Sequence, residues 1–185
     1  MLRRLLQLYI GLVLYGVSTA LFVHANLGAD PWDVFHLGVA KQLGISFGTV
    51  IILTGAAVLL LWIPIRQMPG LGTVSNVIVL GLAADATLAV LPPLASMVAR
   101  SALLVGAIVL NAIATGMYIG AGFGPGPRDG LMTGLHARTG WSLRVIRTAI
   151  ELSVLLIGWL LGGKFGVGTV IYALSIGPLI QLCLP

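Results

Sequence analysis

Long apolar stretches separated by short polar breaks fill the whole chain. Six stretches are apolar over most of their length: residues 5–24, 48–65, 71–91, 98–120, 145–161 and 167–184. A helix needs about 20 apolar residues to cross the hydrocarbon core of a bilayer, and each stretch is close to that length. The pattern therefore predicts an all-α membrane protein with about six transmembrane helices.

The chain also repeats itself with an offset of 96 residues. Aligned on itself with that offset, it matches without a gap, and residues 27–33 lie over 123–129 while residues 70–74 lie over 166–170. Shared apolar composition produces chance matches between leucines. It does not readily produce matches of Gly, Pro, Asp, Ser and Thr in the same order, so the match indicates an internal repeat.

Each repeat, residues 1–95 and residues 96–185, has the same predicted order of elements. A long span is followed by a Gly/Pro break, a short helix, and two spans joined by a tight turn. The short helices are expected at 31–43 and 127–139, and they are too short to cross a bilayer. Three spans are an odd number, so the second repeat enters the membrane from the opposite side. The predicted fold is an inverted-topology repeat, an arrangement found in secondary transporters with a solute site between the repeats.

Composition and charge support a lipid environment. Of the 185 residues, 58% are hydrophobic and 8% are charged, and the mean hydropathy is +1.08. A soluble domain carries about 25% charged residues. The net charge of +5 comes from Lys and Arg at the ends of the apolar stretches rather than from a basic run. Nucleic-acid binding is therefore not expected, and the lipid bilayer is the expected partner.

The basic residues also predict the orientation. Most of them fall on the side of the N-terminus, where they are Arg3, Arg4, Arg66, Arg128 and Arg138, with Arg144 and Arg147 at the mouth of the fifth span. The other side has Lys41, Arg100 and Lys164. Lys and Arg concentrate on the cytoplasmic side of membrane proteins. Both termini are therefore expected in the cytoplasm, and a bundle this thin is compatible with a homodimer.

The two breaks contain the first candidate site residues. The segment Asp-Pro-Trp-Asp at 30–33 is a good helix start, with Asp30 as N-cap and Asp33 near the positive end of the helix dipole. Gly-Pro-Arg-Asp repeats this design and ends at Asp129. One interpretation is that two opposed helix N-termini, with Asp33 and Asp129, frame a solute or ion site. The other is that each acid only caps its own helix.

Neighbouring residues extend this hypothesis. Arg128 is the nearest basic group for a charge on the solute, and Trp32 is placed to line a pocket. Trp32, Trp62, Trp141 and Trp159 all lie near predicted span ends and are typical of interface anchors. The glycine-dense segment 120–126 favours a cavity or hinge at the second break, or a plain cytoplasmic loop.

Polar residues inside the predicted spans are further candidates. They are Asp85 in the third span, Asn111 in the fourth, and Arg147 and Glu151 in the fifth. Charged groups inside a membrane are costly and often functional. Arg147 and Glu151 are four residues apart on one helix face and can neutralise each other. This charged strip fits a solute-specific site, or arginines that extend to the interface.

No catalytic or cofactor motif is visible. The three histidines have no ligand spacing, the chain has one cysteine, Cys183, and neither HExxH nor CxxC occurs, so no metal or other cofactor is expected. No nucleophile and base stand together. Enzymatic activity is therefore not expected.

Three segments resemble a known family: Leu-Gly-Ala-Asp-Pro-Trp-Asp at 27–33, Gly-Pro-Gly-Pro-Arg-Asp-Gly at 124–130, and Gly-Leu-Gly-Thr-Val at 70–74. They are similar to the YczE/YyaS/YitT group of bacterial inner-membrane proteins, and the resemblance covers essentially the whole chain. YitT-like members often have an extra soluble C-terminal domain, so this sequence is closer to the YczE type. The resemblance implies a multi-span protein of the bacterial plasma membrane and leaves the substrate open.

Two functions are the main alternatives, with an intramembrane enzyme as a third. The inverted repeat favours a small secondary transporter or exporter of a small polar or charged solute, on the analogy of fold. The other is a membrane assembly or regulatory partner that transports nothing. A polar cavity around Asp33 and Asp129 that water can reach would favour transport, whereas a dry interior lined by glycine would favour the partner.

Overall fold

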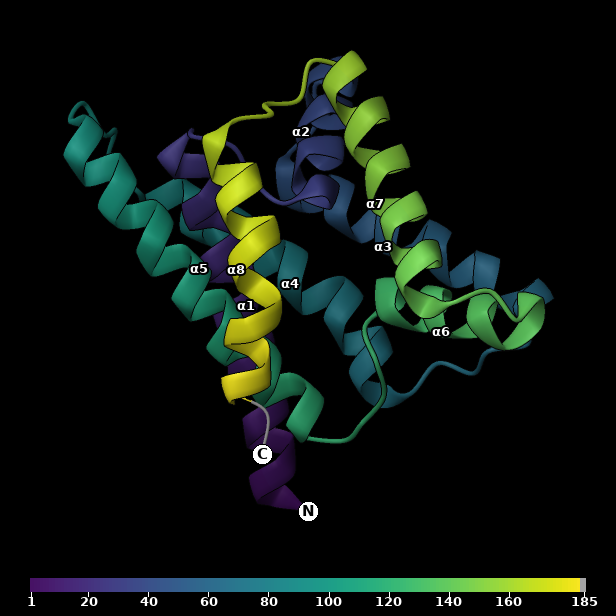
Figure 1. The fold of residues 1–185 in the computed structure, drawn as a ribbon. Helices are drawn as coiled ribbons and strands as arrows, with labels where there is room; N and C mark the ends of the chain where they lie inside the picture. Colours follow the sequence, from purple (N-terminus) through teal and green to yellow (C-terminus); the bar gives the residue numbers. More distant parts are fainter. Residues whose placement is uncertain (184–185) are drawn as a thin grey trace.

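The computed structural model describes residues 1–183, and this part of the chain is all α-helical (Figure 1). In chain order the helices are α1 (Leu2–Ala25), α2 (Pro31–Leu43), α3 (Phe47–Ile65), α4 (Leu71–Val90), α5 (Met97–Gly120), α6 (Pro127–Thr139), α7 (Leu143–Leu160) and α8 (Val167–Cys183). The all-α prediction is confirmed. The last predicted span reaches residue 184, which lies outside the described residues.

Four helices, α1, α3, α4 and α5, are long and apolar enough to cross a membrane. The two remaining predicted spans form α7 and α8. Helix α7 has three charged residues, Arg144, Arg147 and Glu151, and α8 has 17 described residues. These two helices are therefore less apolar or shorter than the other four.

Local chemistry explains where the short and following helices begin. Asp30 caps α2, since its Oδ1 accepts a hydrogen bond of 2.7 Å from the backbone N–H of Asp33. Ser46 and Ser142 cap α3 and α7 in the same way. Helices α2, α3 and α4 begin 96 residues before α6, α7 and α8, respectively. Equivalent sequence positions in the two halves thus form equivalent elements.

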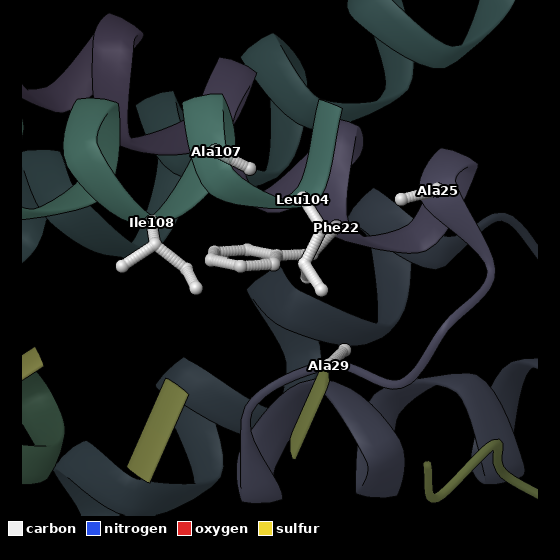
Figure 2. Close-up of a cluster of buried hydrophobic side chains, with 6 residues drawn as sticks. All are labelled: Phe22, Ala25, Ala29, Leu104, Ala107 and Ile108. Carbon is white, nitrogen blue, oxygen red and sulfur yellow. The ribbon is translucent and has the colours of Figure 1, made fainter. Parts of the chain in front are cut away.

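Helices α1 and α5 have the most extensive contact between any two helices, with α4 beside α1 and α8 beside α5. Figure 2 shows the contact between α1 and α5, where Phe22 lies among Leu104, Ala107 and Ile108, with Ala25 and Ala29 at its edge. The small alanine side chains let the two helices approach each other closely. Close approach of this kind is a usual basis of helix packing in membranes.

Each short helix packs on a helix of the other half: α2 packs on α7, and α6 packs on α3. In the second contact Trp62 covers Gly130, where an added Cβ atom would overlap the indole ring. In the first, Gly158 stands at the position equivalent to Trp62 and lies against the backbone of Phe35. The expectation that Trp62 is an interface anchor is wrong, because its side chain is buried and its Nε1–H donates to the Pro127 carbonyl at 3.0 Å.

The Gly-x-Gly-Thr turns hold the breaks in place. The Gly168 N–H donates to the Leu27 carbonyl at 2.8 Å, and the Gly72 N–H donates to the Phe123 carbonyl at 2.8 Å. Next to these carbonyls, Gly28 (φ 108°) and Gly124 (φ 114°) adopt backbone conformations that favour glycine. Each turn therefore clamps the break of the other half. The second break is therefore held against the start of α4 and is not a free loop.

The two halves differ in how their last two helices pack. Helix α3 packs along α4, and Gly48 and Gly81 bring their backbones close together. Within residues 1–183, α7 has no comparable interface with α8, and Figure 1 shows the two helices diverging. Gly177, which is equivalent to Gly81, faces open space. Helices α3 and α4 are therefore packed together, whereas their equivalents α7 and α8 are apart.

Candidate functional site

A cavity of about 230 Å³ lies at the centre of the bundle, and all eight helices contribute to its wall. The N-terminal turns of α2 and α6 meet there. Among the predicted site residues, the wall includes Asp30, Trp32, Arg128, Asp129, Arg147 and Glu151. Residues from both halves are thus brought together around one space.

Arg128 connects the two short helices. Its Nη1 lies 3.3 Å from Asp30 Oδ2, and its Nη2 lies 3.9 Å from Asp33 Oδ1. Its guanidinium group also lies 4.8 Å from the centre of the Trp32 ring, close enough for a cation–π interaction. Both aspartates are buried, so the positive charge of Arg128 is balanced by carboxylates within the protein.

Asp33 lies behind the cavity wall. It is 1% exposed, and its Oδ1 lies 3.3 Å from Nδ1 of the buried His36. Its other oxygen, Oδ2, has no hydrogen-bond partner among residues 1–183. A buried carboxylate is stable only when it is paired or hydrogen-bonded, and here Arg128 and His36 supply the pairing.

Asp129, the equivalent acid in the second half, has different surroundings. Its side chain is exposed to the cavity, and its Oδ2 accepts a hydrogen bond of 3.0 Å from the Tyr118 hydroxyl. No basic side chain of residues 1–183 lies within 4.0 Å of it. The position equivalent to Arg128 is Trp32 in the first half, so the two helix starts supply one arginine, and it lies beside Asp33 rather than Asp129.

Helix α7 adds a further ion pair to the wall. Arg147 Nε donates to Glu151 Oε1 at 2.9 Å, in the spacing that the sequence suggested. Both residues line the cavity. Their side chains are partly exposed, so the pair contributes little to stability.

Two predicted candidates lie elsewhere. Asp85 accepts hydrogen bonds from the Ser46 hydroxyl and the Gly48 N–H, and it ties α4 to the start of α3. Asn111 donates to Ser18 Oγ at 2.9 Å and accepts from the Tyr172 hydroxyl at 3.3 Å. Neither residue is part of the cavity wall. Their polar groups are occupied by bonds between helices.

Several polar residues of the cavity wall were not predicted, among them Tyr15, Tyr118, Tyr172 and Thr115. For three of them the internal repeat contained a signal. With the 96-residue offset, Tyr15 aligns with Asn111 and Tyr172 aligns with Asn76, so both positions are polar in both halves of an otherwise apolar region. Thr115 aligns with Thr19 and is also polar in both halves, whereas Tyr118 aligns with the apolar Phe22 and has no such signal.

The comparisons with known proteins give a family and no activity. An uncharacterized protein of Haemophilus influenzae is 38% identical over 177 residues, which is 96% of this chain and 81% of that protein. The uncharacterized membrane protein YczE of Bacillus subtilis is 30% identical over 179 residues, covering 96% and 83% of the two chains. The uncharacterized protein YyaS of Bacillus subtilis is 23% identical over 180 residues, covering 95% and 90%.

No solved structure matches this chain significantly. The similarity to a membrane protein and the four long apolar helices agree on a membrane location. The resemblance to the YczE type is confirmed. The model of the family of unknown function DUF6198 matches residues 2–185, and the chain belongs to that family.

Proposed function

We propose that this protein is a small secondary transporter or exporter that moves a small polar or charged solute through the central cavity. In this proposal α7 and α8 also cross the membrane, giving six spans in two inverted repeats. The observation that carries the proposal is the cavity itself. It is lined by all eight helices, and the N-terminal turns of both short helices face it with charged side chains.

The charges in this cavity support a solute site rather than a simple packing core. Asp129 and the Arg147–Glu151 pair are exposed or partly exposed to it. Ionised groups at membrane depth are costly unless they are hydrated or paired. A membrane partner with no solute would be expected to fill this region with small apolar side chains, as between α1 and α5.

The difference between the two halves suggests how access changes. The cavity wall includes Arg147 from the first part of α7 and Ile180 from the last part of α8, two helices that diverge (Figure 1). We infer that the cavity opens between the first part of α7 and the last part of α8. This entrance lies on the side where α1 begins, which the basic residues predict to be cytoplasmic. When α7 closes on α8 and α3 separates from α4, the entrance would move to the other side.

The test compares solutes in cells and in their medium. Three strains are needed: cells without the protein, cells with the wild type, and cells with Asp33→Asn and Asp129→Asn combined. Neither acid caps a helix, since Asp30 caps α2 and Gly126 stands at the cap position of α6. Asn has nearly the same shape as Asp, so the double variant removes charge with little change in packing. We expect at least one small polar solute to change its distribution with the wild type and not with the variant.

Equal expression of the two proteins in the membrane fraction is the control. An unchanged distribution of all solutes between the first two strains would contradict transport and favour the assembly partner. A wild-type effect that persists in the double variant would contradict the role of the two acids.

A further inference from the structure

The charges around the cavity do not cancel. Within residues 1–183, the wall and the Arg128 network contain four carboxylates, those of Asp30, Asp33, Asp129 and Glu151, against two guanidinium groups. Three of the four carboxylates are close to an arginine. The remaining one is Asp129, which has only the neutral Tyr118 hydroxyl as a bonded partner in this part of the chain.

Asp129 is also the most exposed of these four carboxylates. Asp33 is 1% exposed, whereas Asp129 is exposed to the cavity. An exposed negative charge without a counter-ion, in a space enclosed by apolar helices, favours a positively charged ligand. The two arginines are already paired, so an anion would have to displace Asp30 or Glu151 to bind them.

The aromatic wall favours an organic cation over a metal ion. Tyr15, Trp32, Tyr118 and Tyr172 all line the cavity, and Tyr15 and Tyr118 meet edge to face with ring centres 5.9 Å apart. Aromatic faces attract ammonium groups. The Trp32 ring is already covered by Arg128, but Tyr118 lies beside Asp129 and Tyr15 and Tyr172 line the same cavity, so the wall suits an alkylated or primary amine. No group of three metal-ligating side chains occurs among residues 1–183.

Two buried polar atoms in the wall need a partner. Trp32 Nε1 and Thr115 Oγ1 have no hydrogen-bond partner among residues 1–183, and each residue is only 6% exposed. A buried indole N–H left without an acceptor is costly. An oxygen atom on the ligand would satisfy the indole N–H, and it could accept from or donate to the threonine hydroxyl.

We propose that the solute is a small organic cation that also has an oxygen function, with the Asp129 carboxylate as its counter-charge and the tyrosines and Trp32 as its wall. The cavity, at about 230 Å³, is smaller than the range of about 300–1,000 Å³ typical of sites for drug-sized ligands, which limits the solute to a small molecule. This inference rests on the proposed function and names its substrate class.

Binding can be tested without transport. The purified full chain in lipid nanodiscs is unfolded by heat in the presence of choline, ethanolammonium or tetramethylammonium. A ligand that binds the folded state raises the unfolding temperature with its concentration. We expect at least one of the three cations to do so. The neutral analogue of choline, in which a tert-butyl group replaces the trimethylammonium group, and acetate should have no such effect.

Two substitutions at one position assign the effect to Asp129. Asp129→Asn should raise the half-maximal cation concentration by about tenfold to hundredfold, which is the loss expected for a hydrogen bond to a charged group. Asp129→Glu keeps the charge and should retain most of the response. Asp85→Asn removes another carboxylate outside the cavity wall and should leave the response unchanged. The unfolding temperature without ligand shows whether each variant is folded.

The outcomes separate this inference from the proposed function. If none of the cations stabilises the protein, if the neutral analogue is as effective as choline, or if Asp129→Asn responds like the wild type, the cation site is overturned. Transport of an anion in the cell experiment would overturn it as well and leave the transporter proposal intact. Cation binding through Asp129, with no solute changed in cells, would support the site and contradict transport.

Discussion

Gly81 lies where α3 and α4 cross most closely, so one added methyl group there should force the two helices apart. A Cβ atom on Gly81 would lie 2.5 Å from the Gly48 carbonyl oxygen and 2.7 Å from Ile52 Cγ1. The first distance is about 1 Å below an ordinary van der Waals contact. The carbonyl belongs to helix backbone and cannot rotate away, so the helices must separate. Their separation would also strain the hydrogen bonds from Ser46 and Gly48 to Asp85.

The size of the effect follows from two opposing terms. Overpacking costs about 1–3 kcal/mol, and contact with backbone places Gly81→Ala near the upper end. Alanine is a better helix former than glycine by about 1 kcal/mol. The net loss should be about 2 kcal/mol, which lowers the melting temperature of a chain this long by about 4–8 °C. Thermal unfolding of the purified protein, followed by tryptophan fluorescence, measures it.

Gly106→Ala is the matched control. Gly106 lies on α5, and a Cβ atom there has no neighbour within 4 Å. This variant gains the helix-forming term of about 1 kcal/mol without the clash and should melt at or slightly above the wild-type temperature. Equal melting temperatures for the two variants would refute the close packing of α3 on α4.

Two further predictions concern burial and topology. Trp62→Phe removes a buried hydrogen-bond donor and should destabilise the protein by about 1–3 kcal/mol in the same unfolding assay. Trp159→Phe, on the exposed side of α7, should change the stability little. Equal effects of the two substitutions would contradict the burial of Trp62. In a Cys183→Ser background, an impermeant thiol reagent added to intact cells should label a cysteine placed at Gln42 and not one placed at Arg138. The reverse labelling pattern would overturn the assigned orientation.

Local signals were enough to predict the helices. Pro31 and Pro127 mark the starts of the short helices, and Ser46 and Ser142 mark the next ones, because proline and cap residues act within one turn of the helix that they start. The repeat then carried each prediction from one half to the other. The long-range partners had no such signal.

Trp62 and Gly130 fit each other as large and small residues, but they lie in different halves, and nothing local to either one indicates the pair. The same limit applied to Tyr118, whose bond to Asp129 depends on how α5 ends beside α6.

For the candidate site, the sequence indicated several of the residues but not which of them form ion pairs with one another. The sequence placed Asp33, Asp129 and Arg128 together because the breaks repeat. It could not tell that Arg128 lies beside Asp30 and Asp33 rather than Asp129, since that choice depends on side-chain conformation at the meeting of two helix ends. Asp85 and Asn111 were included because intramembrane polar groups are often functional. The bonds that occupy them come from other helices.

Solute flux from lipid vesicles shows whether the cavity conducts a solute. Lipid vesicles containing the purified protein are loaded with the small-molecule extract of host cells, transferred to empty buffer, and sampled over time by mass spectrometry. We expect a small cationic solute to leave faster from wild-type vesicles than from vesicles with Asp129→Asn or without protein. Identical release of every solute from the three kinds of vesicle would contradict it.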